Sequence, residues 1–305
     1  MSDGFASLAT ERRDPRYGDI DQLPVHEIAQ LMNSADATVP AAVGRQLLSI
    51  SAAIEAVVER LSDVGRLVYV GAGTSGRLAV LDAAECPPTF GTHPDLVQGI
   101  IAGGPDALVR SLEGTEDDAV AGAAALAAAS VGPRDVVIGV SASGRTPFVV
   151  GAIEEAHRRG ALTAAISCTT GGPLADAVDH PIEVVVGPEI IAGSTRLKAG
   201  TATKLVLNMI STITMIKLGR TYGNRMVELS AVNTKLADRA VRIITDITGV
   251  DDVTARDALT AADRQVKVAI VMIERAVGAD RARALLAANG DRLAAVRRPS
   301  TRGGS

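Results

Sequence analysis

Short apolar runs alternate with amphipathic segments along the middle of the chain, and this alternation predicts the fold. The apolar runs end in glycine or small polar residues, as buried strands do. We expect strands at residues 66–72, 95–104, 135–143, 162–169 and 180–187. Helical spacing predicts helices between them at 75–85, 105–113, 116–129 and 146–160. The predicted fold is therefore α/β, with a five-stranded parallel sheet sandwiched by helices.

Helical periodicity also flanks this region. Residues 38–61 repeat apolar side chains at helical spacing, and residues 197–219 form a long apolar segment. Within that segment, residues 201–219 are apolar on more than one face. Such a helix must be buried on all sides, so we expect a homodimer in which a second copy helps to cover it.

The chain is predicted to have four parts. Residues 225–247 continue as helix, and from about 251 three short amphipathic helices follow that are broken by glycines, which indicates a small C-terminal helical bundle. The expected parts are an N-terminal arm at 1–37, a sheet domain with flanking helices at 38–236, a small helical domain at 237–298 and a disordered tail at 299–305.

Composition excludes several classes of protein. The 305 residues include three Phe, three Tyr and no Trp, and the net charge is -4, which argues against a nucleic-acid partner. Cys86 and Cys168 have no metal-ligand spacing and form no disulfide framework. The N-terminus lacks the apolar region of a signal peptide, and the longest apolar window, 205–216, is too short to span a membrane. We expect a cytoplasmic protein with no membrane partner.

The first candidate motif is GAGTSGR at residues 71–77, between a predicted strand and a helix. Its glycines match the dinucleotide-binding pattern, but the second strand ends in IIAGG at 100–104, without the acid that would bind a ribose. Gly73, Thr74 and Ser75 instead offer backbone N–H groups and hydroxyls at a helix start, which suits an anion. The alternative is that Ser75 only caps its helix.

The second motif, SASGRT at 141–146, follows the third predicted strand. Ser141, Ser143 and Thr146 supply hydroxyls, and Gly144 permits close backbone approach. Ligands of parallel sheets bind beyond the carboxyl ends of the strands, so two hydroxyl-rich loops there predict a phosphate held by neutral donors. Arg77 and Arg145, which follow a glycine in each motif, could equally pair with surface acids.

Two acidic segments could supply general acid–base chemistry. Glu85 lies at the predicted C-terminus of its helix, just before two prolines, where the helix dipole raises a carboxyl pKa and favours a general acid. The alternative is a surface acid that precedes a proline. In EGTEDD at 113–118, Thr115 and Asp118 form a capping-box pattern, which explains the acids without chemistry, although one of them could face the cleft as a base.

The last motif, GSTRLKAGTATK at 193–204, opens the long apolar helix. Its cationic, hydroxyl-rich start, with Ser194 and Lys198, would suit a carboxylate. Ordinary capping and surface charge are the alternative explanation.

Taken together, these motifs resemble the N-acetylmuramic acid 6-phosphate etherases, a family of the SIS (sugar isomerase) fold group. The segments that carry the resemblance are 71–91, 101–104, 113–118, 141–149, 193–212 and 223–236. The ECPPT sequence after TSGR is specific, since generic SIS domains lack it. The predicted C-terminal bundle also resembles the family's small helical domain.

The resemblance implies a lyase of amino-sugar recycling that needs no metal and no cofactor. Glu85 would protonate the departing lactate, and Glu116 would remove the C2 proton of the sugar. The implied substrate-binding residues are Gly73, Thr74, Ser75, Ser141, Ser143, Gly144, Thr146, Ser194 and Lys198. An aldose–ketose isomerase or a catalytically silent sugar-phosphate sensor on the same fold are the alternatives, and the presence of both glutamates favours the lyase.

Overall fold

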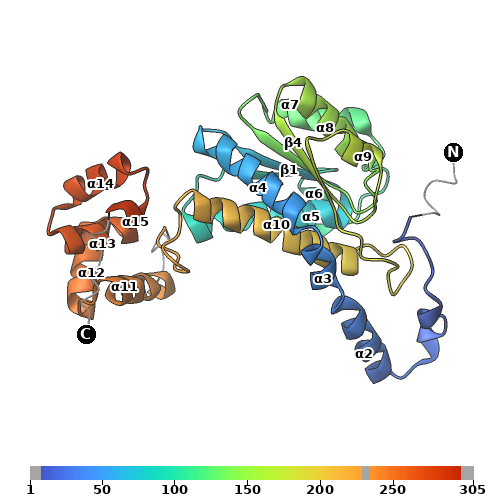
Figure 1. The fold of residues 1–305 in the computed structure, drawn as a ribbon, viewed down its shortest axis with the longest axis horizontal. Coiled ribbons are helices and arrows are strands. Elements are labelled where there is room, and N and C mark those ends of the chain that lie inside the picture. The colour runs from blue at the N-terminus through green and yellow to red at the C-terminus, as the bar shows by residue number, and fades with distance from the viewer. Residues whose placement is uncertain (1–7, 229–233, 297–305) are drawn as a thin grey trace. The chain divides into compact units, whose positions relative to one another are not determined.

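The computed structural model describes residues 8–228 and 234–296 (Figure 1). The chain forms two compact units. The first comprises Met1–Ala84 and Pro94–Thr214, and the second comprises Glu85–His93 and Met215–Ser305. The predicted tail at 299–305 lies outside the described residues, and the predicted four-part division stays a prediction.

The first unit is built on the expected five-stranded parallel sheet. Its strand order is β2-β1-β3-β4-β5. The strands are β1 (Leu67–Gly71), β2 (Val97–Ile101), β3 (Val136–Val140), β4 (Leu162–Ser167) and β5 (His180–Glu183). Each lies within an apolar run that the sequence predicted as a strand, and every pairing is parallel. The α/β prediction is confirmed.

Helices cover both faces of the sheet, as Figure 1 shows. On one face, Val68, Val70 and Val137 pack into a core with α7 (Ala119–Ala128), α8 (Pro147–Arg158) and α9 (Pro173–Asp176). The alternate residues of the strands point to the other face, where α4 (Leu47–Ser62), α5 (Gly73–Phe90) and α10 (Lys198–Lys217) lie. Continuous apolar strands therefore follow from burial on both sides.

A buried carboxyl ties that second face together. Asp82 of α5 accepts hydrogen bonds from Tyr69 Oη at 3.1 Å, Asn208 Nδ2 at 2.6 Å and Ser211 Oγ at 3.1 Å. Burial raises the pKa of Asp82 above its ordinary value, although the three hydrogen bonds oppose the shift. The cluster links β1, α5 and α10, and so holds the middle of the two helices against the sheet.

Several predicted helix boundaries were wrong. The helix expected at 38–61 is divided into α3 (Val39–Gly44) and α4. The expected stop at Pro87 does not occur, because α5 continues to Phe90 with both prolines inside it. Cys86 and Phe90 are buried on either side of the prolines, so packing maintains a last turn that local preference alone would end.

The arm and the segment after α10 also differ from expectation. Within the predicted arm lie two short 3-10 helices, η1 (Pro15–Tyr17) and η2 (Ile20–Gln22), and the longer α2 (Val25–Asp36). A four-residue helix, α6 (Asp106–Val109), replaces the longer one expected at 105–113. Residues 225–228 of the helix predicted at 225–247 are not helical, residues 229–233 lie outside the described residues, and α11 is Thr234–Thr248.

The second unit is helical, as expected. After α11 come α12 (Asp252–Ala261), α13 (Val266–Arg275), α14 (Ala279–Ala288) and the unpredicted α15 (Leu293–Val296). Their apolar faces share one core, which includes Val241, Ile270 and Leu286. Within this unit the buried Lys267 pairs with Glu228 and donates to the carbonyl of Asp291.

Among the described residues, no single helix is both long enough and apolar enough to cross a membrane. Two N-terminal stretches, Val25–Gly44 and Leu47–Ser62, reach the required length and hydropathy only as a pair bent by 60°.

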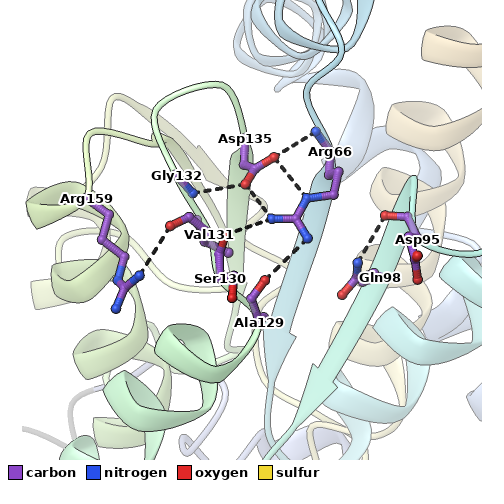
Figure 2. A network of polar contacts seen from close by, with 9 residues as sticks. All are labelled: Arg66, Asp95, Gln98, Ala129, Ser130, Val131, Gly132, Asp135 and Arg159. Atoms are coloured by element: carbon purple, nitrogen blue, oxygen red, sulfur yellow. Dashed lines mark hydrogen bonds and ion pairs between the residues drawn. The ribbon is translucent and has the colours of Figure 1, made fainter.

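An ion pair joins β1 and β3 at the amino ends of these strands (Figure 2). Arg66 donates from Nε to Asp135 Oδ1 at 3.1 Å and from Nη2 to Oδ2 at 2.7 Å. The backbone N–H groups of Arg66 and Gly132 also donate to this carboxylate, each at 3.0 Å. Burial raises the pKa of Asp135, but these hydrogen bonds outweigh it, so the pKa lies below its ordinary value.

We predict that Asp135→Asn lowers the free energy of unfolding by about 1.5–3 kcal/mol at neutral pH, because it weakens hydrogen bonds to a charged group. The folded-state pKa is depressed, so this stabilisation is present above the unfolded pKa of about 3.9 and is lost as pH falls through the folded value. Urea denaturation of both proteins from pH 7 to pH 3 measures the difference. The exposed Asp63→Asn is the control, and a constant difference across that range would contradict the assignment.

Candidate functional site

A pocket of about 240 Å³ opens at the carboxyl ends of β1 and β3. Register places Gly71, the last residue of β1, beside Val140 of β3, so the loops that follow the two strands are neighbours. The pocket is lined by residues of these loops, of the acidic segment, of the arm and of the approach to α10: Glu11, Ala72, Gly73, Thr74, Ser75, Glu116, Asp117, Val140, Ser141, Ala142, Ser143, Arg145, Thr146, Pro147 and Thr195.

The first loop enters α5 with almost no connecting chain. A Cβ on Gly76 would lie 2.6 Å from Ile101 Cγ1 and 2.9 Å from the Gly71 carbonyl oxygen, so only glycine lets the helix start so close to the sheet. Ser75 is the third residue of α5 rather than its N-cap, which removes the capping interpretation. The first turn of α5 therefore presents backbone N–H groups and two hydroxyl residues to the pocket.

The second loop gathers three hydroxyls. Ser141 Oγ lies 3.2 Å from Ser143 Oγ and 2.8 Å from Thr146 Oγ1. Gly144, at φ +64°, makes the turn between them. Thr146 is the N-cap of α8, so the positive end of that helix dipole adds to the hydroxyls. Neutral donors converge here as the sequence predicted.

Carboxylates line the pocket from two separate segments. Glu116 and Asp117 belong to the acidic segment, and the Glu116 carbonyl accepts the N–H of Phe148 at 3.0 Å, which ties this segment to the start of α8. The capping function falls to Asp118, which accepts from Ala121 N at 2.8 Å, and not to Thr115 as the capping-box pattern suggested. Glu116 is thus left facing the pocket.

The third carboxylate, Glu11, comes from the arm and was missed. The carbonyl of Thr10 accepts the N–H of Gly193 at 3.0 Å, and this pairing holds the arm across the approach to α10. A Cβ on Gly193 would lie 2.8 Å from Glu11 Oε2. No local sequence signal marks Glu11, because only the tertiary structure brings the arm to this edge of the sheet.

Four of the expected site residues do not line this pocket. Gly144 forms the turn of the second loop, and Ser194 precedes the lining residue Thr195. Lys198 lies elsewhere in the first unit: it is 6% exposed and its Nζ donates to the Val186 carbonyl at 2.7 Å. Burial lowers the pKa of Lys198.

Glu85 is the fourth of these residues. It lies about three helical turns after Gly73 along α5, is exposed, and belongs to the second compact unit. Since α5 extends to Phe90, the prediction that Glu85 lies at the helix C-terminus was wrong, and the helix-dipole argument does not apply to it.

The two motif arginines have different surroundings. Arg77 Nε and Nη2 donate to the carbonyls of Leu108 and Arg110, so Arg77 neither lines the pocket nor pairs with an acid there. Arg145 lines the pocket, and its Nε is buried without a hydrogen-bond partner among the described residues. In the same part of the chain, no group of three or more His, Cys, Asp or Glu side chains could hold a metal ion.

Comparison with known proteins agrees with the fold of the first unit. Residues 49–157 match the family model of the glucokinase regulatory protein N-terminal SIS domain, and residues 119–213 match the SIS domain. A phosphoheptose isomerase from Francisella tularensis has the same fold over 63% of this chain and 98% of its own, with 21% identity and a TM-score of 0.50.

Relatives of much higher identity span nearly the whole chain. An N-acetylmuramic acid 6-phosphate etherase from Rubrobacter xylanophilus is 54% identical over 96% of this chain and 98% of its own. One from Streptomyces avermitilis is 58% identical over 88% of this chain and 86% of its own. One from Pectobacterium atrosepticum is 51% identical over 92% of each. The chain therefore belongs to the N-acetylmuramic acid 6-phosphate etherase family.

Proposed function

We propose that this chain is a carbon–oxygen lyase that cleaves the D-lactyl ether of N-acetylmuramic acid 6-phosphate, yielding D-lactate and N-acetylglucosamine 6-phosphate in peptidoglycan recycling. Family membership supports the reaction. The observation that supports it is the pocket itself, whose lining includes Glu116 and the clustered hydroxyls of Ser141, Ser143 and Thr146.

The phosphate binds at the two loops in this proposal. The hydroxyls of Ser75, Ser141, Ser143 and Thr146 donate to its oxygens, together with N–H groups around Gly73 and Thr74, while Gly144 keeps the second loop open. The first turns of α5 and α8 add positive dipole ends. Neutral donors hold a dianion without a fixed cation, so the sugar can extend from this end of the pocket toward the carboxylates.

Glu116 acts as the base. In the open-chain sugar the C2 proton is α to the C1 aldehyde, so a carboxylate can remove it. The electron pair left at C2 forms the enolate and then expels the C3 oxygen, while an acid protonates the departing lactate. Water adds to the resulting α,β-unsaturated aldehyde at C3, and a proton returns to C2. The atoms balance as substrate plus water giving the two products.

Glu85 is assigned as that acid from the ECPPT motif. Glu85 does not line the pocket of the first unit, so only the motif supports its role as the acid. Both the motif and the position in the pocket lining support the role of Glu116 as the base. The acid role of Glu85 therefore stands on the family resemblance and needs a direct test.

Oxygen tracing tests the proposed reaction. Elimination and hydration break the bond between C3 and the ether oxygen, so in H₂¹⁸O the label should enter the C3 hydroxyl of N-acetylglucosamine 6-phosphate and not the hydroxyl of D-lactate. Enzymatic assay of D-lactate with mass spectrometry of both products measures this. An isomerase or a silent sensor would release no D-lactate, and label in the lactate would indicate displacement at the lactyl carbon.

Glutamate variants separate the two proposed roles. Glu116→Gln should abolish both lactate release and exchange of the C2 proton with D₂O, a loss of roughly 10²–10⁴-fold for each acid–base function. Glu85→Gln should still exchange the C2 proton while lactate release falls by a similar factor. NMR of the sugar in D₂O follows the exchange. Glu113→Gln, an exposed acid of the same segment, is the control, and loss of exchange in Glu85→Gln would overturn its role as the acid.

The expected homodimer is retained as part of the proposal, with a different basis. Val206, Leu207 and Ile210 of α10 are fully buried within a single chain, so α10 no longer requires a second copy. Large apolar side chains are instead exposed near the N-terminus, at Val25 (84%) and Leu48 (89%). Cys86 and Cys168 are buried and are not joined by a disulfide, which suits the reducing cytoplasm in which we place the protein.

We predict a light-scattering mass of twice the 31.3 kDa of one chain at micromolar concentration. Leu48→Glu should shift the protein toward the monomer, because it buries a charge in the interface. Val253→Glu, at an equally exposed apolar position of the second unit, should not. A wild-type protein that remains monomeric would contradict the homodimer.

A further inference from the structure

The pocket at the ends of β1 and β3 has an unusual balance of charge. Three carboxylate residues line it, Glu11, Glu116 and Asp117. Arg145 is the single lysine or arginine among the lining residues. The substrate under the proposed function carries two anionic groups, the 6-phosphate and the carboxylate of the lactyl group, and both must enter a pocket that acids surround.

The Nε of Arg145 is buried and has no hydrogen-bond partner among the described residues. No carboxylate lies within 4.0 Å of the Arg145 guanidinium in the residues that the structure describes. A buried donor without an acceptor is unfavourable, so such groups are uncommon unless a ligand satisfies them. Arg66 shows the contrast, since Asp135 pairs with it through two nitrogens.

Arg77, the matching arginine of the first loop, shows that an arginine after the loop glycine is not always left without acceptors. Arg77 follows Gly76 as Arg145 follows Gly144, yet Arg77 donates to the carbonyls of Leu108 and Arg110. Arg145 has no such acceptors and lines the pocket. Both loops carry hydroxyl residues, but the Arg77 guanidinium binds backbone carbonyls whereas Arg145 lines the pocket.

The backbone of Arg145 limits which anion it can reach. Its N–H donates to Ser143 Oγ at 3.2 Å, so the residue is anchored directly to the hydroxyl cluster. Its Cγ lies 4.0 Å from the position that a Cβ on Gly172 would take, so this part of the side chain lies near Gly172. The hydroxyls and helix starts already supply donors for a phosphate, whereas a planar guanidinium matches a carboxylate through two parallel hydrogen bonds.

We propose that Arg145 binds the lactyl carboxylate of the substrate and thereby selects the ether substrate over its sugar product, which lacks that group. The inference rests on the proposed function and names a subsite within it. It replaces Lys198, whose ammonium is bound to the Val186 carbonyl elsewhere, as the cation for this carboxylate. Arg145 offsets the repulsion between the pocket carboxylates and the lactyl group, and it retains the lactate end while the C3–O bond breaks.

The test compares ligands that differ only at the lactyl group. The probes are N-acetylmuramic acid 6-phosphate, its neutral lactyl methylamide and N-acetylglucosamine 6-phosphate, measured by calorimetry with catalytically impaired Glu116→Gln as the background. In that background the free acid should bind roughly 10–100-fold tighter than the methylamide, as expected for a charge-assisted pair. With Arg145→Gln added, the two should bind equally, and the affinity for N-acetylglucosamine 6-phosphate should not change.

Control variants make each outcome decisive. Ser143→Ala should weaken all three ligands, because each carries the phosphate. Arg77→Gln should leave all three affinities unchanged. Arg145→Lys should recover part of the preference for the free acid, since it keeps the charge but loses the paired geometry, and this variant separates charge recognition from misfolding.

Two results would overturn the proposal. One is an Arg145→Gln protein that still prefers the free acid over the methylamide as strongly as before. The other is equal weakening of N-acetylglucosamine 6-phosphate, which would make Arg145 a phosphate ligand. If wild-type protein binds the substrate but releases no D-lactate, the proposed function fails, while the ligand comparison still decides the partner of Arg145.

Discussion

The parallel pairing of β1 with β3 is the constraint on which the site depends. Register sets Gly71 beside Val140, so the chain leaves both strands at the same edge of the sheet and enters two helices there. The first turn of α5 then offers backbone N–H groups, Thr146 is the N-cap of α8, and the hydroxyl residues of each loop lie next to these helix starts. At the opposite ends of the same strands, Arg66 and Asp135 secure the pairing through two hydrogen bonds between their side chains. The geometry of the site therefore depends on the pairing of β1 with β3.

Different donors suit the two anionic ends of the proposed substrate. A phosphate has several oxygens and accepts hydrogen bonds from many directions, so converging hydroxyls and N–H groups satisfy it without a counter-ion. A carboxylate is planar and has two oxygens, which an arginine matches in one plane. The carboxylates that line the pocket add a further requirement. They favour proton abstraction but repel anions, and the unpaired Arg145 is placed where it can offset that repulsion.

Close packing around glycines explains why so small a pocket can contain so many polar groups. At Gly76 any side chain would collide with Ile101 and with the Gly71 carbonyl, so the first turn of α5 lies directly against the sheet. Across the pocket, the N–H of Phe148 bonds to the Glu116 carbonyl, which ties the acidic segment to the start of α8. These contacts bring the phosphate loops and the proposed base together without long, flexible connections.

The sequence by itself determined the sheet and its site, and tertiary structure decided which polar residues serve that site. Apolar runs alternating with helical segments predicted every strand, since burial on both faces of a parallel sheet leaves a strong local pattern. The hydroxyl motifs predicted that the two loops after β1 and β3 would lie together at this edge of the sheet, because their position after a strand follows from chain order alone. Local patterns failed where distant packing intervenes. Burial of Phe90 carries α5 past two prolines and leaves Glu85 in mid-helix. The approach of the arm to Gly193 brings Glu11 to the pocket. The Val186 carbonyl binds the Lys198 ammonium away from the pocket, whereas Arg145 Nε has no acceptor among the described residues. This difference depends on contacts between segments far apart in sequence.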